Sequence, residues 1–415
     1  MKRNRLMLLS LLLGFGVALT FTSCDDEDDN NVDDNNDGEN VIVTDNITDD
    51  TTWEKENTYQ LGGRIVVEEG ATLTIEPGTI IKGEAGTGTN ATALIVAKGS
   101  QIMAEGEADA PIIFTTVADE ITPEQIATGD FQSPNLDPDA NGYWGGVIVL
   151  GNAPISVSEG STAQIEGIPA TDKSGEYGGD DEDDNSGVLK YVSIRHGGSN
   201  IGEGNEINGL TLGGVGSGTT VENVEVVANQ DDGIEWFGGT VDISNALTWN
   251  AGDDGLDADQ GWNGTCSNFA VISSDDHVFE LDGIEGDTGD PSEIEKYGSY
   301  TFKNGYVIAN TEVTSSDLIN LDPETSVHFE NVFFTDIEDG QQITLKDDNK
   351  LPDDFLEGVD TKFTDVVLNV TDVADYIDGS ASGVNAGEAP ANESAIDLSV
   401  FEWTWAHQSG TLKKW

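Results

Sequence analysis

Pairs of aspartates recur at a fixed spacing in the middle of the chain. Successive pairs begin 22 residues apart, at Asp231-Asp232, Asp253-Asp254 and Asp275-Asp276. A repeat in the low twenties is the length of one coil of a β-solenoid. Neighbouring coils stack about 4.8 Å apart, so equal spacing predicts a ladder of carboxylates. Carboxylates this close repel one another unless a cation, a proton or water lies between them.

Such a ladder has the donor chemistry of a calcium site. Ca²⁺ takes about six to eight oxygen ligands in irregular geometry, and several coils together can supply them. The candidate ligands are Asp231, Asp232, Asp253, Asp254, Asp257, Asp275 and Asp276. The alternative interpretation is structural, because Asp-Gly pairs form good corners in which each Asp caps its own turn. The spacing alone leaves both interpretations open.

Short apolar runs separated by Gly, Asn and Asp fill the chain from about residue 52 to 370. Many alternate with period 2 and are rich in β-branched residues, which predicts strands. A sandwich would show hairpin signals about every 8–12 residues, whereas these runs recur in larger blocks. Asn223 and Asn245 are also 22 residues apart, and corner Asn ladders are typical of solenoids. A short helix is predicted at Thr122 to Ala127.

Several stretches resemble right-handed parallel β-helix proteins of the pectate-lyase-like superfamily. They are residues 69–79, 111–115, 143–146 and 191–198, and the resemblance covers roughly residues 60–340. It implies an all-β fold, a single right-handed parallel β-helix of coils near 22 residues with polar loop insertions. The resemblance says little about function, because lyases, hydrolases, adhesins and binding proteins all have this fold.

A local resemblance to the polygalacturonase family of hydrolases suggests an enzyme as the alternative. It implies that Asp232, Asp253 and Asp254 are three catalytic carboxylates, with His277 one coil later. One would act as a general acid and two would position water. The pattern departs at Gln230, where the family has Asn, and the family's basic element is missing. A polysaccharide hydrolase or lyase therefore stays the second hypothesis, behind non-catalytic binding.

The N-terminus has the pattern of a targeting segment. Basic residues precede the apolar run Leu6 to Leu19, and Phe21-Thr22-Ser23 leads into Cys24. This resembles a bacterial lipoprotein signal, which implies a signal peptide at 1–23 and lipidation of Cys24. The acidic, Asn-rich segment that follows resembles the surface-export signal of lipoproteins from the Bacteroidetes. Together they predict an outer-membrane lipoprotein that faces the cell exterior.

Charge narrows the range of partners. The formal net charge is −62, with 17 Lys and Arg against 79 Asp and Glu. Nucleic acid is excluded as a partner, because phosphate contacts need basic residues. The predicted membrane contact is through the lipid anchor only. The leading expectation is a β-helix that binds an extracellular glycan or nutrient, stabilised by calcium and accessory to an outer-membrane transporter or to adhesion.

The predicted organisation has four parts. They are a signal peptide at 1–23, an acidic disordered tether at 24–51, a parallel β-helix at 52–375, and a loop with a C-terminal capping strand at 376–415. Open ends of a solenoid expose strand edges and need a cap. Phe401, Trp403 and Trp405 would share one face of that strand. Cys266 is expected to be buried and inert.

Overall fold

A computed structural model describes residues 38–169, 171–201, 207–284, 299–311, 313–321, 325–345, 361–379 and 382–415. Gly38–Trp415 forms one compact unit, and the remaining unit, Met1–Asp37, lies outside the described residues. The predicted signal peptide, Cys24 and half of the predicted acidic tether fall in that outer part. No helix among the described residues is long and apolar enough to span a membrane.

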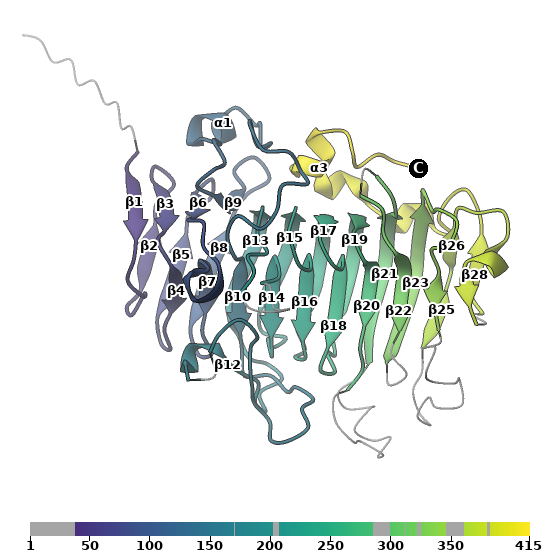
Figure 1. Cartoon of the computed structure of the whole chain (residues 1–415), viewed down its shortest axis with the longest axis horizontal. Helices are drawn as coiled ribbons and strands as arrows, with labels where there is room; N and C mark the ends of the chain where they lie inside the picture. The colour runs from purple at the N-terminus through teal and green to yellow at the C-terminus, as the bar shows by residue number, and fades with distance from the viewer. Residues whose placement is uncertain are drawn as a thin grey trace, which may run out of the picture. The chain divides into compact units, whose positions relative to one another are not determined.

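Two large sheets wind around one core, as Figure 1 shows, and strands within each pair in parallel. The first contains β1 (Asn40–Val43), β2 (Thr51–Trp53), β3 (Thr58–Leu61), β5 (Thr72–Ile75), β6 (Ile80–Gly83), β8 (Gln101–Glu105), β9 (Ile112–Thr116), β13 (Gly187–Arg195), β15 (Thr220–Val227), β17 (Ile243–Ala251), β19 (Thr265–Ser274), β21 (Ser299–Ile308), β23 (Ser326–Thr335), β25 (Lys362–Thr364), β26 (Val366–Leu368) and β28 (Val384–Ala386). The second contains β4 (Arg64–Val67), β7 (Ala93–Val96), β10 (Val147–Leu150), β14 (Leu210–Gly213), β16 (Ile234–Phe237), β18 (Leu256–Asp259), β20 (His277–Leu281), β22 (Asp317–Leu321), β24 (Ile343–Thr344) and β27 (Ile377–Asp378).

The remaining elements are short. A small antiparallel pair joins β11 (Ala163–Gln164) to β12 (Glu176–Tyr177). The helices are α1 (Pro123–Ala127) and α3 (Trp405–Gln408), and the 3-10 turns are η1 (Gly88–Asn90), η2 (Lys173–Gly175), η4 (Val373–Asp375), η5 (Glu393–Ala395) and η6 (Leu398–Phe401). The helix predicted at Thr122 to Ala127 is confirmed, since the Thr122 side chain accepts the N–H of Gln125 and caps α1.

Each long strand of the first sheet has a residue with left-handed backbone near its middle, where the strand bends. In β15, β17 and β19 this residue is Asn223, Asn245 or Asn268, at φ 55°, 57° and 51°. Asn tolerates this conformation better than most residues. The Asn245 amide donates to Asn223 (3.0 Å), and the Asn268 amide donates to Asn245 (2.7 Å). The predicted corner ladder is confirmed, and the bend gives each coil three faces.

The core contains inward side chains from all three faces. Trp236 and Trp262 stack with ring centroids 4.3 Å apart, and Phe302 stacks on Phe329 in the coils that follow. Cys266 is fully buried in this core, as predicted. The all-β parallel β-helix predicted from sequence is therefore confirmed.

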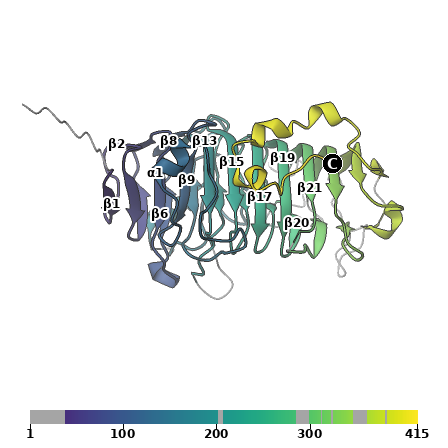
Figure 2. The ribbon, with the colours of Figure 1, turned by 90° about the horizontal axis from the view of Figure 1, so that it is seen from above.

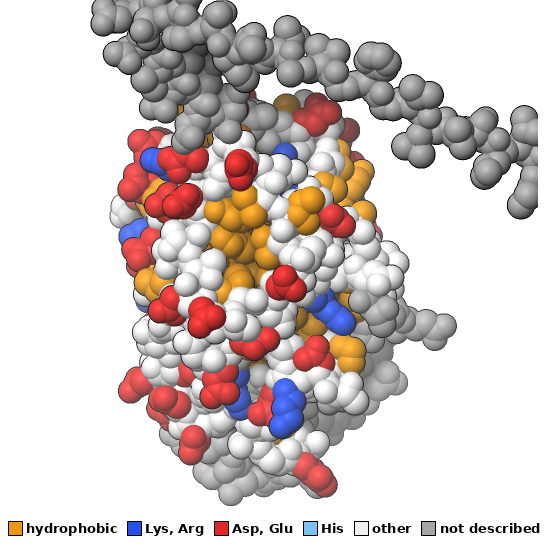
Figure 3. Space-filling model, turned by 90° about the vertical axis from the view of Figure 1, so that its left-hand side faces the viewer, with side chains coloured by type: hydrophobic (Ala, Val, Ile, Leu, Met, Phe, Trp, Pro, Cys, Tyr) orange, Lys and Arg blue, Asp and Glu red, His pale blue; other side chains and the backbone are white. Residues whose placement is uncertain are grey.

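The ordered coils begin earlier than the predicted boundary at residue 52. Residues Asn40–Val43 form β1, which pairs with β3, so the predicted tether of 24–51 includes part of the first coil. The alternation of Val41 and Val43 places both against the core, while Ile42 is exposed. Figure 3 views this end of the coils and shows hydrophobic side chains in its middle with acidic side chains around them.

The C-terminal segment is not the predicted capping strand. Residues 398–408 form η6 and α3, and the segment lies along the side of the first sheet, as Figure 2 shows. Phe401, Trp405 and Leu412 pack on outward side chains of β17 and its neighbours, including Trp249 and Ile272. This arrangement removes an apolar outer face from water, which is a larger gain than covering one strand edge.

Candidate metal and ligand site

Two rows of polar side chains cross three neighbouring coils on the second sheet. The corner row contains Asp232, Asp254 and His277. The strand row contains Glu235 of β16, Asp257 of β18 and Glu280 of β20, which pair directly in register. The coil from Ile243 to Cys266 has one residue more than the coil before it. His277, not Asp276, therefore stacks on Asp254.

The corner carboxylates connect one coil to the next. Asp232 Oδ1 accepts the backbone N–H of Asp254 (2.9 Å), and Asp254 Oδ1 accepts the backbone N–H of His277 (2.6 Å). The imidazole Nδ1 of His277 also lies 2.9 Å from Asp254 Oδ1. Each aspartate thus satisfies a donor one coil further on. The structural interpretation had placed the same carboxylates on their own turns.

The carboxylates gather into three groups whose ligand atoms lie within 4.8 Å of one another. The groups are Asp231, Asp232 and Asp253; Asp232, Glu235 and Asp257; and Asp254, His277 and Glu280. Of the proposed calcium ligands, five belong to these groups, and Asp275 and Asp276 do not. Asp253 and Asp254, expected to act as a pair, belong to different groups.

Burial and mutual repulsion raise the pKa of four of these carboxyl groups, those of Asp232, Glu235, Asp257 and Glu280. Burial, followed by the charges of neighbouring carboxylates, raises the pKa of Asp232, Glu235 and Asp257 well above their usual range. Burial raises the pKa of Glu280 to about 9, with a further rise from its hydrogen bond to Asp254. Burial alone would lower the pKa of His277, but the hydrogen bond to Asp254 and nearby carboxylates outweigh it and raise it to about 9.

The group of Asp232, Glu235 and Asp257 is called the middle group below. Two buried oxygen acceptors, one in this group and one beside it, have no hydrogen-bond partner. They are Asp257 Oδ1 and Asn208 Oδ1, in residues that are 8% and 1% exposed. The Asn208 amide donates its N–H to Glu235, so its oxygen lies beside the carboxylates. Buried acceptors without donors are costly, and a cation satisfies them. The middle group therefore fits a hard cation such as Ca²⁺.

Sequence reasoning missed Glu235 and Asn208 as contributors to the site, and it identified Glu280 as an oxygen donor without placing it in the strand row. Glu235 and Glu280 occupy the same register as Asp257, and their acidic type at spacings of 22 and 23 residues could have indicated the strand row. Asn208 carries no such signal, because it precedes β14 at a corner whose coil contains a long insertion.

The outer face of this sheet changes in character along the stack. The strand row of Glu235, Asp257 and Glu280 continues in register into the coils on either side. The residues that precede it are Val66, Ile95, Ile148 and Thr211, and those that follow it are Asn320 and Thr344. The loop around β11 and β12 covers part of its apolar end. The face therefore offers an apolar region and an acidic region on one surface.

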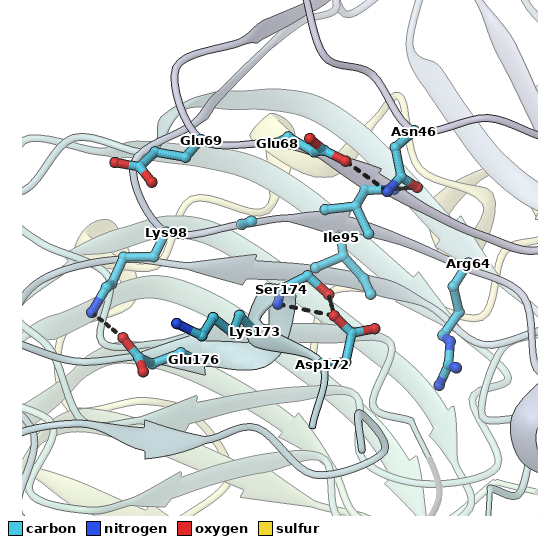
Figure 4. Close-up of a pocket in the computed structure, with 12 residues that line it drawn as sticks. Asn46, Arg64, Glu68, Glu69, Ile95, Lys98, Asp172, Lys173, Ser174 and Glu176 are labelled. Carbon is cyan, nitrogen blue, oxygen red and sulfur yellow. Dashed lines mark hydrogen bonds and ion pairs between the residues drawn. The ribbon is translucent and has the colours of Figure 1, made fainter. Parts of the chain in front are cut away.

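A cavity of about 710 Å³ opens at the apolar end of this face (Figure 4). Val66, Ile95 and Ala97 provide apolar lining, and the charged lining is Arg64, Glu68, Glu69, Lys98, Asp172, Lys173 and Glu176. Lys98 pairs with Glu176 at 3.1 Å, and Arg64 donates to the carbonyl oxygen of Gly167 (3.2 Å). Gly167 follows Glu166, whose charge acts on Glu235. This loop therefore connects the cavity to the acidic rows.

The stacked parallel coils define the class of protein as a parallel β-helix, and the outward rows make part of its second sheet polar. The family model of the pectate-lyase like beta helix domain matches residues 45–408, so the chain belongs to this family. The family supports a role related to polysaccharides. Searches of curated proteins and of solved structures gave no match.

Proposed function

We propose that this chain is a lipoprotein anchored through Cys24 to the outer membrane, whose β-helix binds an extracellular glycan on its second sheet. Calcium held by the strand row orders that face. The lipid anchor follows from the N-terminal pattern, and the glycan from the family and the polar outward row. Release of the bound glycan to an outer-membrane transporter is the role that suits a tethered binder.

One observation carries the proposal. Asp232, Glu235 and Asp257 come within 4.8 Å of one another in a buried position, beside the two acceptor oxygens that have no donor. Such a group is stable only with protons or a cation between its members. Calcium bound there removes the repulsion, and so it orders the face of the sheet that we propose binds the glycan.

The test is calorimetric binding of a glycan panel to residues 25–415, which include every described residue. Asp257→Asn removes one ligand charge and keeps the side-chain shape, and Asp275→Asn is the matched control at an exposed position. We expect binding in Ca²⁺, loss in EDTA and in Asp257→Asn, and retention in Asp275→Asn. Absence of binding to every glycan would refute the glycan role. Binding that persists unchanged in EDTA would refute the calcium role.

One observation favours the enzyme as a second candidate. Glu280 is only partly buried, and with a pKa of about 9 it retains its proton at neutral pH, as a general acid must. Hydrolysis or elimination by this group would release new chain ends from a polysaccharide. Reducing-end release that is lost in Glu280→Gln and in the Asp253→Asn, Asp254→Asn double variant would establish catalysis. No release from any substrate would exclude it.

A further inference from the structure

The third group on the acidic rows differs from the other two in its donor atoms. Asp254, His277 and Glu280 each offer one atom, and these atoms lie within 4.8 Å of one another. One of the three is an imidazole nitrogen. Calcium prefers oxygen ligands throughout, whereas a mixed set of imidazole and carboxylate suits Zn²⁺ and related divalent ions.

We propose that Asp254, His277 and Glu280 form a second metal site, which binds a divalent transition metal ion such as Zn²⁺. Three protein ligands leave at least one coordination position open to water or to a ligand hydroxyl. This site lies one coil beyond the middle carboxylate group. The inference goes beyond glycan binding and does not depend on it.

The backbone positions the three ligands before any metal arrives. Glu280 and His277 come from one strand, β20, and Asp254 comes from the corner that precedes β18. Asp254 is 1% exposed and is held by the backbone N–H of His277, so its carboxylate has a fixed direction. His277 Nδ1 and Asp254 Oδ1 lie 2.9 Å apart, a separation that two ligands of one metal ion can adopt.

The other nitrogen of His277 has a carboxylate beside it. Asp276 Oδ1 lies 3.5 Å from His277 Nε2. In the metal-free chain the Nδ1–H of His277 is hydrogen-bonded to the nearer carboxylate of Asp254 (2.9 Å), so a metal ion would displace that proton, and Asp276 would hold the remaining proton on Nε2. Asp276, expected from the sequence to be a calcium ligand, is thereby assigned to orienting the imidazole.

The next residue in register, which belongs to the neighbouring carboxylate group, adds a buried acceptor beside this site. Asp257 pairs with Glu280 across the strands, is 8% exposed, and has an oxygen without a hydrogen-bond donor. The charges of Glu280 and Asp254 both act on Asp257 and help to raise its pKa. A buried acceptor without a donor, in register with one of the three ligands, indicates that this part of the acidic rows lacks positive charge. The His277 side chain is 16% exposed and Asp276 49%, so an ion can enter from solvent.

The experiment uses chelator-treated residues 25–415 and Zn²⁺ alone, with binding measured by calorimetry. His277→Gln removes the nitrogen ligand, and His407→Gln on α3 is the matched control outside the acidic rows. We expect one zinc site that His277→Gln weakens at least tenfold and His407→Gln leaves unchanged. Asp276→Asn should weaken it about tenfold, in the range found when partners of ligating histidines are removed. Zinc binding unaffected by His277→Gln would overturn the proposal, as would absence of zinc binding.

A second measurement works on the unaltered chain, in case a variant fails to fold. The sequence contains four histidines, so imidazole NMR signals are few enough to resolve. Zinc should change the chemical shifts of one histidine. That histidine should be His277, with its largest change at Nδ1. Movement of another histidine instead would contradict the site. A failed glycan assay would leave both zinc results standing, so the two proposals fail separately.

Discussion

At the scale of single residues, Asp254 has two tasks. Its buried oxygen accepts the backbone N–H of His277 and contacts the imidazole, so it joins two coils while it faces Glu280. The same carboxylate therefore supports the structural interpretation of the Asp ladder and the metal interpretation together. A carboxylate can have both roles, because it can accept a backbone N–H and also face a bound cation.

Asp254→Ala should lower the free energy of unfolding by about 2–4 kcal/mol, because it leaves the backbone N–H and the imidazole N–H of His277, both partly buried, without their acceptor. Chemical denaturation at pH 7 in EDTA measures this change. Asp275→Ala, at an exposed corner, should change it by no more than about 0.5 kcal/mol. Equal effects of the two variants would show that the inter-coil hydrogen bonds contribute nothing.

Stability of the metal-free chain should fall as pH rises from about 6.5 to 9. Glu280 and His277 both have a pKa of about 9 in the folded chain, against 4.5 and 6.5 as ordinary values. Each group therefore binds its proton more tightly when folded, so its stabilisation is complete below the unfolded pKa and lost as pH rises through 9.

Thermal unfolding in EDTA across this pH range checks the sign. Calcium or zinc replaces the protons, so the gain in melting temperature on adding metal should grow with pH. A melting temperature that rises between pH 6.5 and 9 in EDTA would contradict the shifted pKa values.

At the scale of elements, the Asn ladder fixes the bend of the first sheet. Asn245 donates to Asn223, accepts from Asn268, and has a left-handed backbone. Its side chain therefore joins three coils at the point where the strand changes face.

Asn245→Ala should cost about 2–4 kcal/mol, the sum of two lost hydrogen bonds and a Cβ in left-handed backbone. Asn245→Gly removes only the hydrogen bonds and should cost about 1–2 kcal/mol less than Asn245→Ala. Both are measured by chemical denaturation. An Ala variant as stable as the Gly variant would show that backbone conformation is not part of the ladder's role.

The period of the sequence predicted the coils, but it could not predict where one coil gains a residue. The extra residue before Cys266 moves His277 into the position that equal spacing gave to Asp276. The C-terminal aromatics show a different limit. Phe401 and Trp405 alternate as in a strand, but their burial against Trp249 and its neighbours depends on a distant apolar face that no local pattern reveals.

At the scale of the whole molecule, the net charge bears on the proposed attachment to the membrane. An anionic membrane repels a chain with a net charge of −62, so this composition suits attachment through a lipid rather than through a basic surface. An acidic surface also concentrates divalent cations from the medium. Both properties agree with a protein displayed outside the cell, where calcium and glycans are available.

Cys24→Ser should release the chain from the membrane fraction of the cells that produce it. The unaltered chain should fractionate with the outer membrane and be cleaved by protease added to intact cells. Immunoblotting of the fractions measures both properties. Membrane retention of the Cys24→Ser variant, or protection of the unaltered chain from protease, would contradict the proposed anchoring or its outward orientation.

The central claim is that the acidic rows hold cations, and calcium titration tests it most directly. Residues 25–415 treated with chelator should bind Ca²⁺ in calorimetry with a rise in melting temperature, and Asp257→Asn should lose that binding. Zinc binding should survive this substitution, because its three ligands stay in place. Absence of calcium binding in the unaltered chain, or equal binding in Asp257→Asn, would contradict the claim. The carboxylates would then have only the structural role of joining neighbouring coils by hydrogen bonds.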